Sequence, residues 1–296
     1  MNINYEFLKE LEDKYGESFY LLFTDVFKEN FDEFLGEFRE FYPKTYIGYS
    51  YKTNYTPRLC EIIYEKGGYA EVVSEMEYDL AIRVGVPPEK IIVNGPYKNY
   101  NALNKFLLGG SIVNLDSYRE LDDLLLISDK NKEKSLNVGV RCNFQINNDL
   151  ISRFGFDVEH VDFKSIFDKI NNVRNISLKG LHCHFPNRDL ESYTSRVEKM
   201  LLLIDEFFEK PPEFIDVGGG YFGKMNKELA KQFSCPVPKY NEYAEVIAKK
   251  INNHFSNLSE REQPKLILEP GSAVVANTMN FISKVIDIKQ IREKRI

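Results

Sequence analysis

A lysine stands where an apolar run gives way to polar residues, in the stretch GYSYKTNYTP at positions 48–57. The run Tyr46–Tyr49 is β-prone, so Lys52 is expected to follow directly on a strand. A lysine amine in a partly desolvated site loses its proton readily and can then attack a carbonyl carbon. By itself the stretch favours a solvated surface lysine, so other residues must decide what this amine does.

Three consecutive glycines, Gly218, Gly219 and Gly220, follow another β-prone run in the segment DVGGGYFG, residues 216–223. Glycines at the end of a strand let backbone N–H groups approach an anion without obstruction by side chains, and phosphate is the natural ligand. The segment is neither a dinucleotide fingerprint nor a nucleotide-binding P-loop. A plain tight turn is the alternative.

Two histidines, His182 and His184, stand two residues apart at the end of a further β-prone run. On one face of a strand, two such rings can ligate the metal of a hydrolase. The other histidines, His160 and His254, fall in expected helices, and no further ligands are evident, so we expect no metal. The alternative is a buried histidine beside one that packs on a flat group.

Glu269 opens the segment EPGS directly after the apolar run Lys265–Leu268. A carboxylate at the end of a buried strand is costly unless a cationic group lies beside it. A protonated pyridine nitrogen would serve, and an arginine or lysine partner is the alternative.

The elements that must position these residues alternate regularly along the chain. We expect strands at Thr45–Ser50, Tyr69–Val73, Lys90–Val93, Ser111–Leu115, Leu136–Arg141, Ser177–Cys183, Glu213–Val217 and Lys265–Leu268. Amphipathic patterns between them predict helices at Thr56–Lys66, Glu75–Val84, Asn99–Leu108, Ser117–Ile127, Phe163–Asn172, Leu190–Phe208 and Asn241–His254, with Pro57 and Ser117 as start signals.

Eight strands that alternate with helices over about 250 residues are typical of a closed (β/α)8 barrel of the α/β class, with a doubly wound open sheet as the alternative. In such a barrel the active site forms at the carboxyl ends of the strands. Those ends carry Lys52, Ser74 and Glu77, Asn94, Asp116, Arg141, His184, the glycine turn and Glu269. A lysine, a histidine, a glycine-rich turn and a carboxylate at four strand ends are the parts of a cofactor site.

Composition narrows the class of protein further. The 296 residues are 43% hydrophobic with a net charge of −6, and no basic block suggests binding to nucleic acid or to an anionic membrane. The N-terminal residues lack the features of a signal peptide, and no run is long enough to span a membrane. The four cysteines are scattered and form no metal or disulfide pattern, so we expect a cytoplasmic protein.

Six motifs together resemble one known family, the fold-type III pyridoxal-phosphate enzymes of the ornithine/diaminopimelate/arginine decarboxylase group. In chain order they are YSYKTN (49–54), VVSEMEYDLAIRVGVPPEKIIVNGPYK (72–98), RFGF (153–156), GLHCHF (180–185), IDVGGGYFG (215–223) and EPGSAVVANT (269–278). The matches cover nearly the whole chain, in the family's order and at its spacing.

The resemblance implies catalytic roles for three residues. Lys52 would form the Schiff base with the aldehyde of pyridoxal 5'-phosphate, and His184 would stack on the pyridine ring. Glu269 would pair with the pyridine nitrogen and keep the ring cationic, so that the electrons left by departing CO2 run into the ring. Alanine racemases, which are similar in fold, place an arginine there instead, so the carboxylate favours decarboxylation over racemisation.

The resemblance also implies the remaining contacts of the cofactor. Gly218, Gly219 and Gly220 would hold the phosphate together with the backbone at Gly271, and Arg141 would sit near the ring and His184. Glu71, Ser74 and Glu77 would line the same mouth, with their roles left open.

Two local departures from the family bear on the substrate. The family reads His-Ile-Gly-Ser where this chain has His184-Phe185-Pro186-Asn187, and Pro186 has no N–H to donate to a phosphate. Ser272 stands where the family's EPGR motif has an arginine, so a bidentate clamp for a carboxylate is lost. This loss weakens diaminopimelate as the substrate in particular.

The third departure concerns domains. We expect residues 1–279 to form the barrel domain that binds pyridoxal phosphate, with an N-terminal lead-in segment, and residues 280–296 to begin a truncated C-terminal β domain. In the family, that domain contributes residues across a head-to-tail dimer, so we expect a homodimer with shared active sites in the full-length protein. The chain is expected to be a fragment, a truncated product or half of a split enzyme that cannot finish its site alone.

The sequence therefore predicts a pyridoxal-phosphate-dependent decarboxylase acting on a basic or dicarboxylic amino acid, of the diaminopimelate, ornithine, lysine or arginine type. A second hypothesis is a homologue without catalysis that binds the cofactor or a partner subunit, and a third is an amino-acid racemase. The sequence leaves open which amino acid is the substrate.

Overall fold

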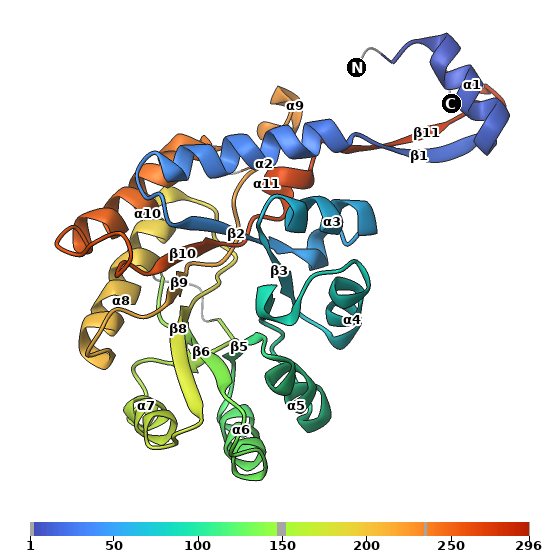
Figure 1. Ribbon diagram of the computed structural model, residues 1–296. Helices are drawn as coiled ribbons and strands as arrows, with labels where there is room; N and C mark the ends of the chain where they lie inside the picture. The colour runs from blue at the N-terminus through green and yellow to red at the C-terminus, as the bar shows by residue number, and fades with distance from the viewer. Residues whose placement is uncertain (1–2, 147–151, 234–235, 296) are drawn as a thin grey trace.

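Eight parallel strands form a closed barrel in the computed structural model, which describes residues 3–146, 152–233 and 236–295 (Figure 1). The strands are β2 (Thr45–Ser50), β3 (Tyr69–Val72), β4 (Ile91–Val93), β5 (Ile112–Leu115), β6 (Leu136–Asn143), β8 (Ile176–His182), β9 (Phe214–Asp216) and β10 (Lys265–Leu268). Their order is β5-β4-β3-β2-β10-β9-β8-β6, and pairing of β5 with β6 closes the ring. The predicted (β/α)8 barrel is confirmed, and each strand lies within two residues of its expected bounds.

Helices surround the barrel, as expected for alternating strands and helices (Figure 1). The seven predicted helices are found as α3 (Pro57–Glu65), α4 (Glu75–Arg83), α5 (Tyr100–Gly109), α6 (Tyr118–Lys130), α7 (Phe163–Asn171), α8 (Leu190–Phe207) and α10 (Tyr240–His254). The start signals are confirmed, since Pro57 begins α3 and the Ser117 side chain accepts a hydrogen bond from the Glu120 N–H at α6. No helix in the described part of the chain combines the length and apolar character that a bilayer crossing requires.

An unpredicted helix, α2 (Thr24–Arg39), takes the eighth position in the ring, where it contacts α10 and α3. Phe27, Phe31, Phe34 and Phe38 recur at intervals of three or four residues and are all buried against the barrel. The alternation of strands and helices does not reveal α2, because this helix precedes the first barrel strand instead of following the last one.

Smaller elements complete the chain. They are α1 (Tyr5–Tyr15), β1 (Ser18–Leu22), the 3₁₀ turns η1 (Tyr51–Thr53) and η2 (Pro88–Lys90), β7 (Phe156–Asp157), α9 (Lys227–Ala230), α11 (Ser272–Val275), β11 (Met279–Ser283), β12 (Gln290–Ile291) and β13 (Lys294–Arg295).

Phe214 packs inside the barrel, together with Ile92 and Ile267. Its ring requires glycines on β8 and β6, because a Cβ atom at Gly180 would lie 2.8 Å from the ring and one at Gly139 would lie 3.0 Å from it. This apolar layer closes the barrel from one side, so the polar side chains above it face only the carboxyl ends of the strands.

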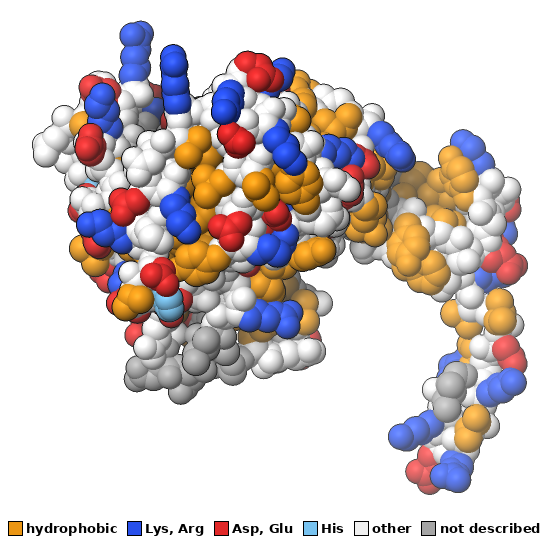
Figure 2. All heavy atoms as spheres, turned by 90° about the horizontal axis from the view of Figure 1, so that it is seen from below, with side chains coloured by type: hydrophobic (Ala, Val, Ile, Leu, Met, Phe, Trp, Pro, Cys, Tyr) orange, Lys and Arg blue, Asp and Glu red, His pale blue; other side chains and the backbone are white. Residues whose placement is uncertain are grey.

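A two-stranded ribbon stands away from the barrel (Figure 1). Strand β1 pairs antiparallel with β11, with Tyr20 opposite Phe281. These two side chains are exposed, as are Val285, Ile286 and Ile288 in the segment that follows β11. Figure 2 shows hydrophobic side chains along this projecting arm. The ribbon therefore presents apolar surface that the barrel does not cover.

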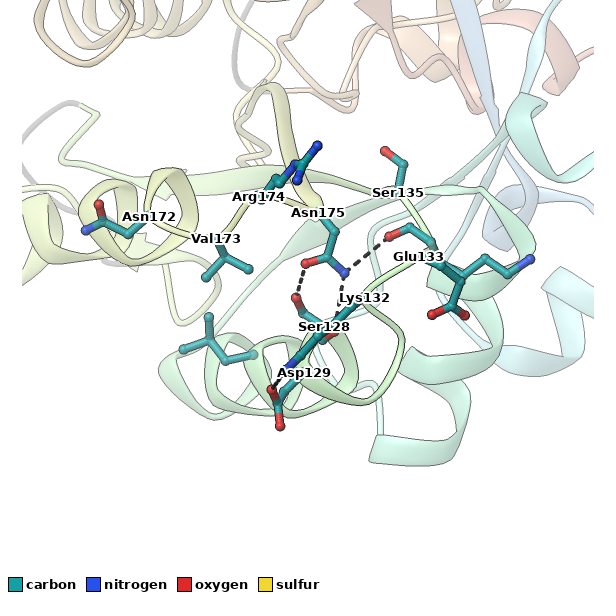
Figure 3. A pocket seen from close by; sticks show the side chains of 11 residues that line it. Ser128, Asp129, Lys132, Glu133, Ser135, Asn172, Val173, Arg174 and Asn175 are labelled. Atoms are coloured by element: carbon teal, nitrogen blue, oxygen red, sulfur yellow. Dashed lines mark hydrogen bonds and ion pairs between the residues drawn. The ribbon is translucent and has the colours of Figure 1, made fainter.

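A wide depression of about 850 Å³ lies at the amino-terminal end of the barrel strands, beside β6 and β8 (Figure 3). The Asn175 side chain crosses it and donates to the carbonyl oxygens of Ser128, Asn131 and Lys134 at 3.0–3.3 Å. These polar groups lock the turns that lead into the strands, a stabilising role that is usual for this face of a barrel.

Candidate active site

A smaller cavity, of about 210 Å³, lies inside the mouth formed by the carboxyl ends of the strands. Its walls include four of the residues singled out in the sequence, namely Lys52, Arg141, His184 and Glu269. They come from the ends of β2, β6, β8 and β10, which are far apart in the chain and meet only because the barrel closes. Glu71, Asn94, His182 and Phe154 line the same cavity.

The Lys52 amine faces a buried carboxylate. The residue lies in the short turn η1 directly after β2, and its Nζ donates to Glu71 Oε2 at 2.7 Å. Ser50 Oγ donates to the same oxygen at 2.5 Å, and Asn94 Nδ2 donates to Glu71 Oε1 at 3.3 Å. The Glu71 side chain is fully buried while that of Lys52 is 38% exposed, so the amine is held in place yet open to the cavity.

The charge state of Lys52 differs from the expectation that this amine loses its proton readily. Burial favours the neutral amine, but the carboxylates of Glu71 and Glu269 outweigh it and raise the pKa of Lys52. The chain alone therefore holds an ammonium at this position, which must give up a proton before it can act as a nucleophile.

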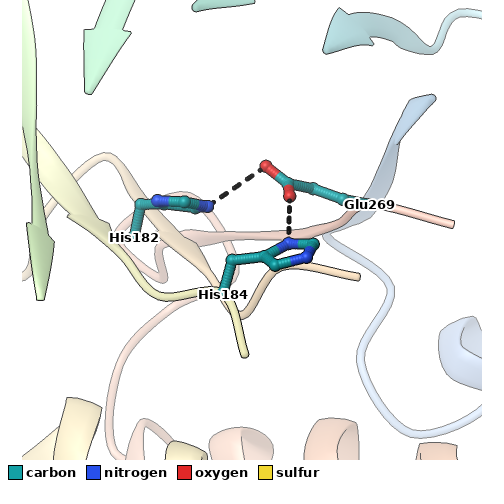
Figure 4. Close-up of side chains that lie close together, drawn as sticks. All are labelled: His182, His184 and Glu269. Carbon is teal, nitrogen blue, oxygen red and sulfur yellow. Dashed lines mark hydrogen bonds and ion pairs between the residues drawn. The ribbon is translucent and has the colours of Figure 1, made fainter. Parts of the chain in front are cut away.

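Glu269 lies between two histidines at the centre of the cavity (Figure 4). His184 Nδ1 lies 3.2 Å from Glu269 Oε2, and His182 Nε2 lies 3.4 Å from Glu269 Oε1. Asn94 Nδ2 donates a further hydrogen bond to Glu269 Oε1. Burial alone would favour the protonated acid, but His182, His184 and Lys52 hold the pKa of Glu269 well below its usual range.

His182 is the more deeply buried of the two histidines. It is fully buried, and burial lowers its pKa despite the nearby Glu269. The expectation that one of the two histidines is buried agrees with this position, and His182 also forms part of the cavity wall. The donor atoms of His182, His184 and Glu269 lie within 4.8 Å of one another. The absence of a metal stays a prediction.

The position of one proton decides what His184 does. Its Nδ1 lies 3.1 Å from the Gly219 amide nitrogen and 3.2 Å from Glu269 Oε2. An unprotonated Nδ1 accepts from the amide, whereas a protonated Nδ1 donates to the carboxylate. His184 is thus joined to both the glycine turn and the central carboxylate, with its ring partly exposed to the cavity.

The glycines adjoin the cavity without being among its lining residues. A Cβ atom at Gly219 would lie 2.4 Å from the Glu269 carbonyl oxygen and 3.3 Å from the His184 ring. Gly218 and Gly220 have positive φ values of 72° and 106°, which L side chains rarely adopt. A Cβ at Gly271 would lie 2.1 Å from Thr53 Oγ1, next to Lys52. The backbone can pass this close only because these residues are glycines.

Arg141 reaches the cavity from β6. Its guanidinium donates to Asp116 Oδ1 at 2.8 Å and lies 4.9 Å from the centre of the Phe154 ring. Both side chains of this ion pair are buried, and the Asp116 carboxylate compensates the positive charge of Arg141. The structure brings Arg141 and His184 to one cavity, as the resemblance implied.

Asp216 lies at the end of β9 and begins the glycine motif, and the sequence predicts no role for it. It is fully buried, and its Oδ1 accepts a hydrogen bond from the Gly218 N–H at 2.9 Å. Burial and the charge of Glu269 raise the pKa of Asp216 well above its usual range. Asp216 thus keeps its proton more strongly than a free carboxylic acid does, while Glu269 stays ionised nearby.

We expect Asp216→Asn to stabilise the chain at neutral pH. The folded chain keeps a proton on Asp216 that the unfolded chain releases above about pH 3.8. Relative to Asp216→Asn, the free energy of unfolding of the unmodified chain should therefore fall as pH rises toward the raised pKa, by about 1.4 kcal/mol per unit between the two pKa values. Urea unfolding from pH 5 upward measures this slope, above the range in which the depressed pKa of Glu269 acts. Identical slopes for both chains would contradict the raised pKa of Asp216.

Comparison with known proteins shows a match over most of the chain. The family model described as the pyridoxal binding domain of pyridoxal-dependent decarboxylases matches residues 28–276, which include all eight barrel strands. The chain is 27% identical over 292 residues to a diaminopimelate decarboxylase of Aquifex aeolicus and 27% identical over 302 residues to one of Methanocaldococcus jannaschii. These alignments cover 94% and 95% of this chain but only 64% and 66% of the relatives.

Solved structures show the same fold. A diaminopimelate decarboxylase from M. jannaschii in complex with L-lysine superposes with a TM-score of 0.80, at 24% identity over 97% of this chain and 68% of that one. A lysine/ornithine decarboxylase from Vibrio vulnificus in complex with putrescine superposes with a TM-score of 0.76, at 18% identity over 98% of this chain and 73% of that one.

Proposed function

Because the chain belongs to the pyridoxal-dependent decarboxylases, whose pyridoxal binding domain it contains at residues 28–276, we propose that it forms the barrel of an amino-acid decarboxylase. Its cofactor is pyridoxal 5'-phosphate, as the family's binding domain implies. One observation carries the proposed activity. A lysine amine, a histidine ring and an ionised, buried carboxylate converge on one cavity at the carboxyl ends of the strands.

The described residues fit this cofactor. The glycine turn offers the close backbone approach that a phosphate needs, since a Cβ at Gly219 or Gly220 would meet neighbouring atoms at 2.4 Å and 3.0 Å. Glu269 stays ionised in a buried position, which suits a cationic ring nitrogen. When bound, pyridoxal phosphate supplies an electron sink for the electron pair that departing CO2 leaves behind.

We assign the roles as follows. Lys52 would hold the aldehyde carbon of the cofactor, and Glu71, which contacts its Nζ, is the group placed to take the proton that Lys52 must lose. Glu269 would keep the proton on the ring nitrogen, and His184 would cover one face of the ring. Arg141 balances charge beside them, and the backbone at Gly218, Gly219, Gly220 and Gly271 binds the phosphate.

We propose an amino acid with a second amino or carboxyl group as the substrate. The names of the relatives support this class, since they include diaminopimelate and lysine/ornithine decarboxylases. Ser272 stands at the position of the family's arginine. Its hydroxyl already donates to the Tyr221 carbonyl oxygen at 3.2 Å, so that hydrogen bond is not offered to a substrate carboxylate. A distal amino group is therefore favoured over a distal carboxylate.

We further propose that the barrel domain, residues 1–279, is followed by a β domain that begins within residues 280–296 and that completes the site in a homodimer. The exposed apolar residues of the ribbon, such as Tyr20 and Phe281, support a covering domain. Since the chain spans less than two thirds of the first two relatives, the partner and the complete activity are proposals. Limited proteolysis that cuts the barrel as fast as the 284–289 segment would argue against this division.

We place the protein in the cytoplasm. The three cysteines that the structure describes, Cys60, Cys142 and Cys183, are buried free thiols, which suits a reducing compartment.

The experiment that tests the function is a screen for CO2 release. The native protein, loaded with pyridoxal phosphate, is offered lysine, ornithine, arginine and meso-diaminopimelate, and we expect one of them to release CO2 well above the others. Binding of the cofactor without CO2 from any amino acid would contradict this activity and support the non-catalytic alternative. Interconversion of alanine enantiomers on a chiral column would indicate the racemase instead.

A further inference from the structure

Arg196 is a fully buried cation without a carboxylate partner among the described residues. It lies in the middle of α8, where the amphipathic pattern of the sequence gives no sign of a function. The other buried cations do have acidic partners, since Arg141 pairs with Asp116 and Lys98 with Glu120. A buried charge without a counter-ion is costly, so the position of Arg196 calls for an explanation.

The guanidinium of Arg196 joins two loops at the ends of neighbouring strands. It donates to the Gly219 carbonyl oxygen at 3.0 Å, in the glycine turn after β9. It also donates to the carbonyl oxygens of Phe185 and Asn187, at 3.2 and 2.6 Å, in the HFPN segment after β8. The side chain is packed over the Tyr193 ring, with its carbon Cζ 4.1 Å from the ring centre.

The two loops that Arg196 joins already touch each other. A Cβ atom at Gly220 would lie 3.0 Å from the Asn187 carbonyl oxygen and 3.4 Å from the Tyr193 hydroxyl. The carbonyl oxygens of both loops point back toward Arg196, which leaves the positive charge directly behind the glycine turn. The loops thus share one cationic support.

We propose that Arg196 is a positioning residue that fixes these loops as one phosphate-binding cradle and supplies the counter-charge for the cofactor's phosphate from behind. The inference rests on the proposed function. Pro186 in the loop after β8 has no N–H to donate, and the Ser272 hydroxyl already donates to the Tyr221 carbonyl oxygen, so the charge of Arg196 adds attraction where these two residues offer no free donor.

Two neighbours offer matched controls. Arg188 belongs to the same loop, but its guanidinium lies over the Phe222 ring at 5.3 Å and is not bonded to the carbonyl oxygens that Arg196 holds. The Tyr193 hydroxyl donates to the same Gly219 carbonyl oxygen at 2.7 Å but carries no charge. Arg188→Gln therefore removes a charge without touching the cradle, and Tyr193→Phe removes a bond to the cradle without removing a charge.

The test compares pyridoxal phosphate with pyridoxal, which has the same ring and aldehyde and lacks the phosphate. Equilibrium affinities are measured by absorbance titration for the unmodified chain, Arg196→Gln, Arg196→Lys and the two controls. We expect Arg196→Gln to weaken pyridoxal phosphate roughly tenfold to a hundredfold, as loss of a buried charge near an anion should. Its pyridoxal affinity should stay within about threefold. Arg196→Lys keeps the charge but cannot bridge both loops as the guanidinium does, so it should recover part of the loss. Both controls should change the ratio of the two affinities by less than about threefold.

A purely structural role predicts a different result, in which Arg196→Gln weakens both ligands by the same factor, and that result would overturn the proposal. If Arg196→Gln does not fold, the comparison of Arg196→Lys with the unmodified chain decides, and a selective loss of pyridoxal phosphate by more than about tenfold overturns it. An unmodified chain that binds neither ligand would refute the proposed function itself. Binding of both ligands with an unchanged ratio in Arg196→Gln would refute only the role of Arg196.

Discussion

Lys52→Ala is expected to abolish covalent attachment of the cofactor and to lower CO2 release by roughly 10³-fold or more, as removal of a nucleophile does in other enzymes. The amine of Lys52 lies in the cavity beside His184 and Glu269. Lys98, the one lysine that is buried in the described part of the chain, is paired with Glu120 and does not line this cavity. Loss of the visible absorbance of the bound cofactor, followed in a spectrophotometer, measures the effect directly.

A second consequence of the same substitution requires a control. Glu71 is fully buried and pairs with Lys52, so Lys52→Ala leaves a carboxylate without its cation and should also lower stability. Lys52→Arg keeps a cation beside Glu71 but offers no amine that can bond an aldehyde carbon. Both variants should lose the covalent attachment, whereas only the alanine variant should lose marked stability. Full activity in Lys52→Arg would refute the assignment.

Glu269→Gln is expected to lower CO2 release by roughly 10²-fold to 10⁴-fold while the cofactor still binds. The carboxylate is ionised at the centre of the cavity, and the neutral amide cannot hold a proton on the ring nitrogen by charge. The hydrogen bond from Asn94 can persist to the amide oxygen, so the fold around the site should survive. Steady-state CO2 release and cofactor titration, carried out on the same preparation, separate the two effects.

Glu269→Asp serves as the control for this prediction, because it keeps the charge on a shorter side chain. It should recover part of the activity that Glu269→Gln loses. The role of the carboxylate fails if Glu269→Gln releases CO2 within about threefold of the unmodified protein at saturating cofactor.

The sequence predicts the barrel well because each strand is short, apolar and separated from the next by an amphipathic helix. The eight strands agree within two residues, and the closed ring then brings Lys52, Arg141, His184 and Glu269 to one mouth. Helix α2 was not predicted, because this eighth helix of the ring precedes the first barrel strand instead of following the last one.

The partners within the site could not be predicted, because they depend on where side chains at separate strand ends meet. Glu71 was expected at the mouth without a role, and only the closed barrel brings it to the Lys52 amine. The balance of burial against two carboxylates at Lys52 likewise requires the three-dimensional arrangement, and it raises the pKa instead of lowering it. Arg196 gives no signal in the sequence, because a charged residue in an amphipathic helix is usually on its solvated face.

The central claim is that Lys52 holds the cofactor in a site built around Glu269. Reduction of the protein with borohydride in the presence of pyridoxal phosphate, followed by peptide mass spectrometry, tests it most directly. We predict that the peptide containing Lys52 carries the reduced cofactor in stoichiometric amount and that other lysines are labelled only in traces. Stoichiometric label on a different lysine, with Lys52 unmodified, would contradict the claim.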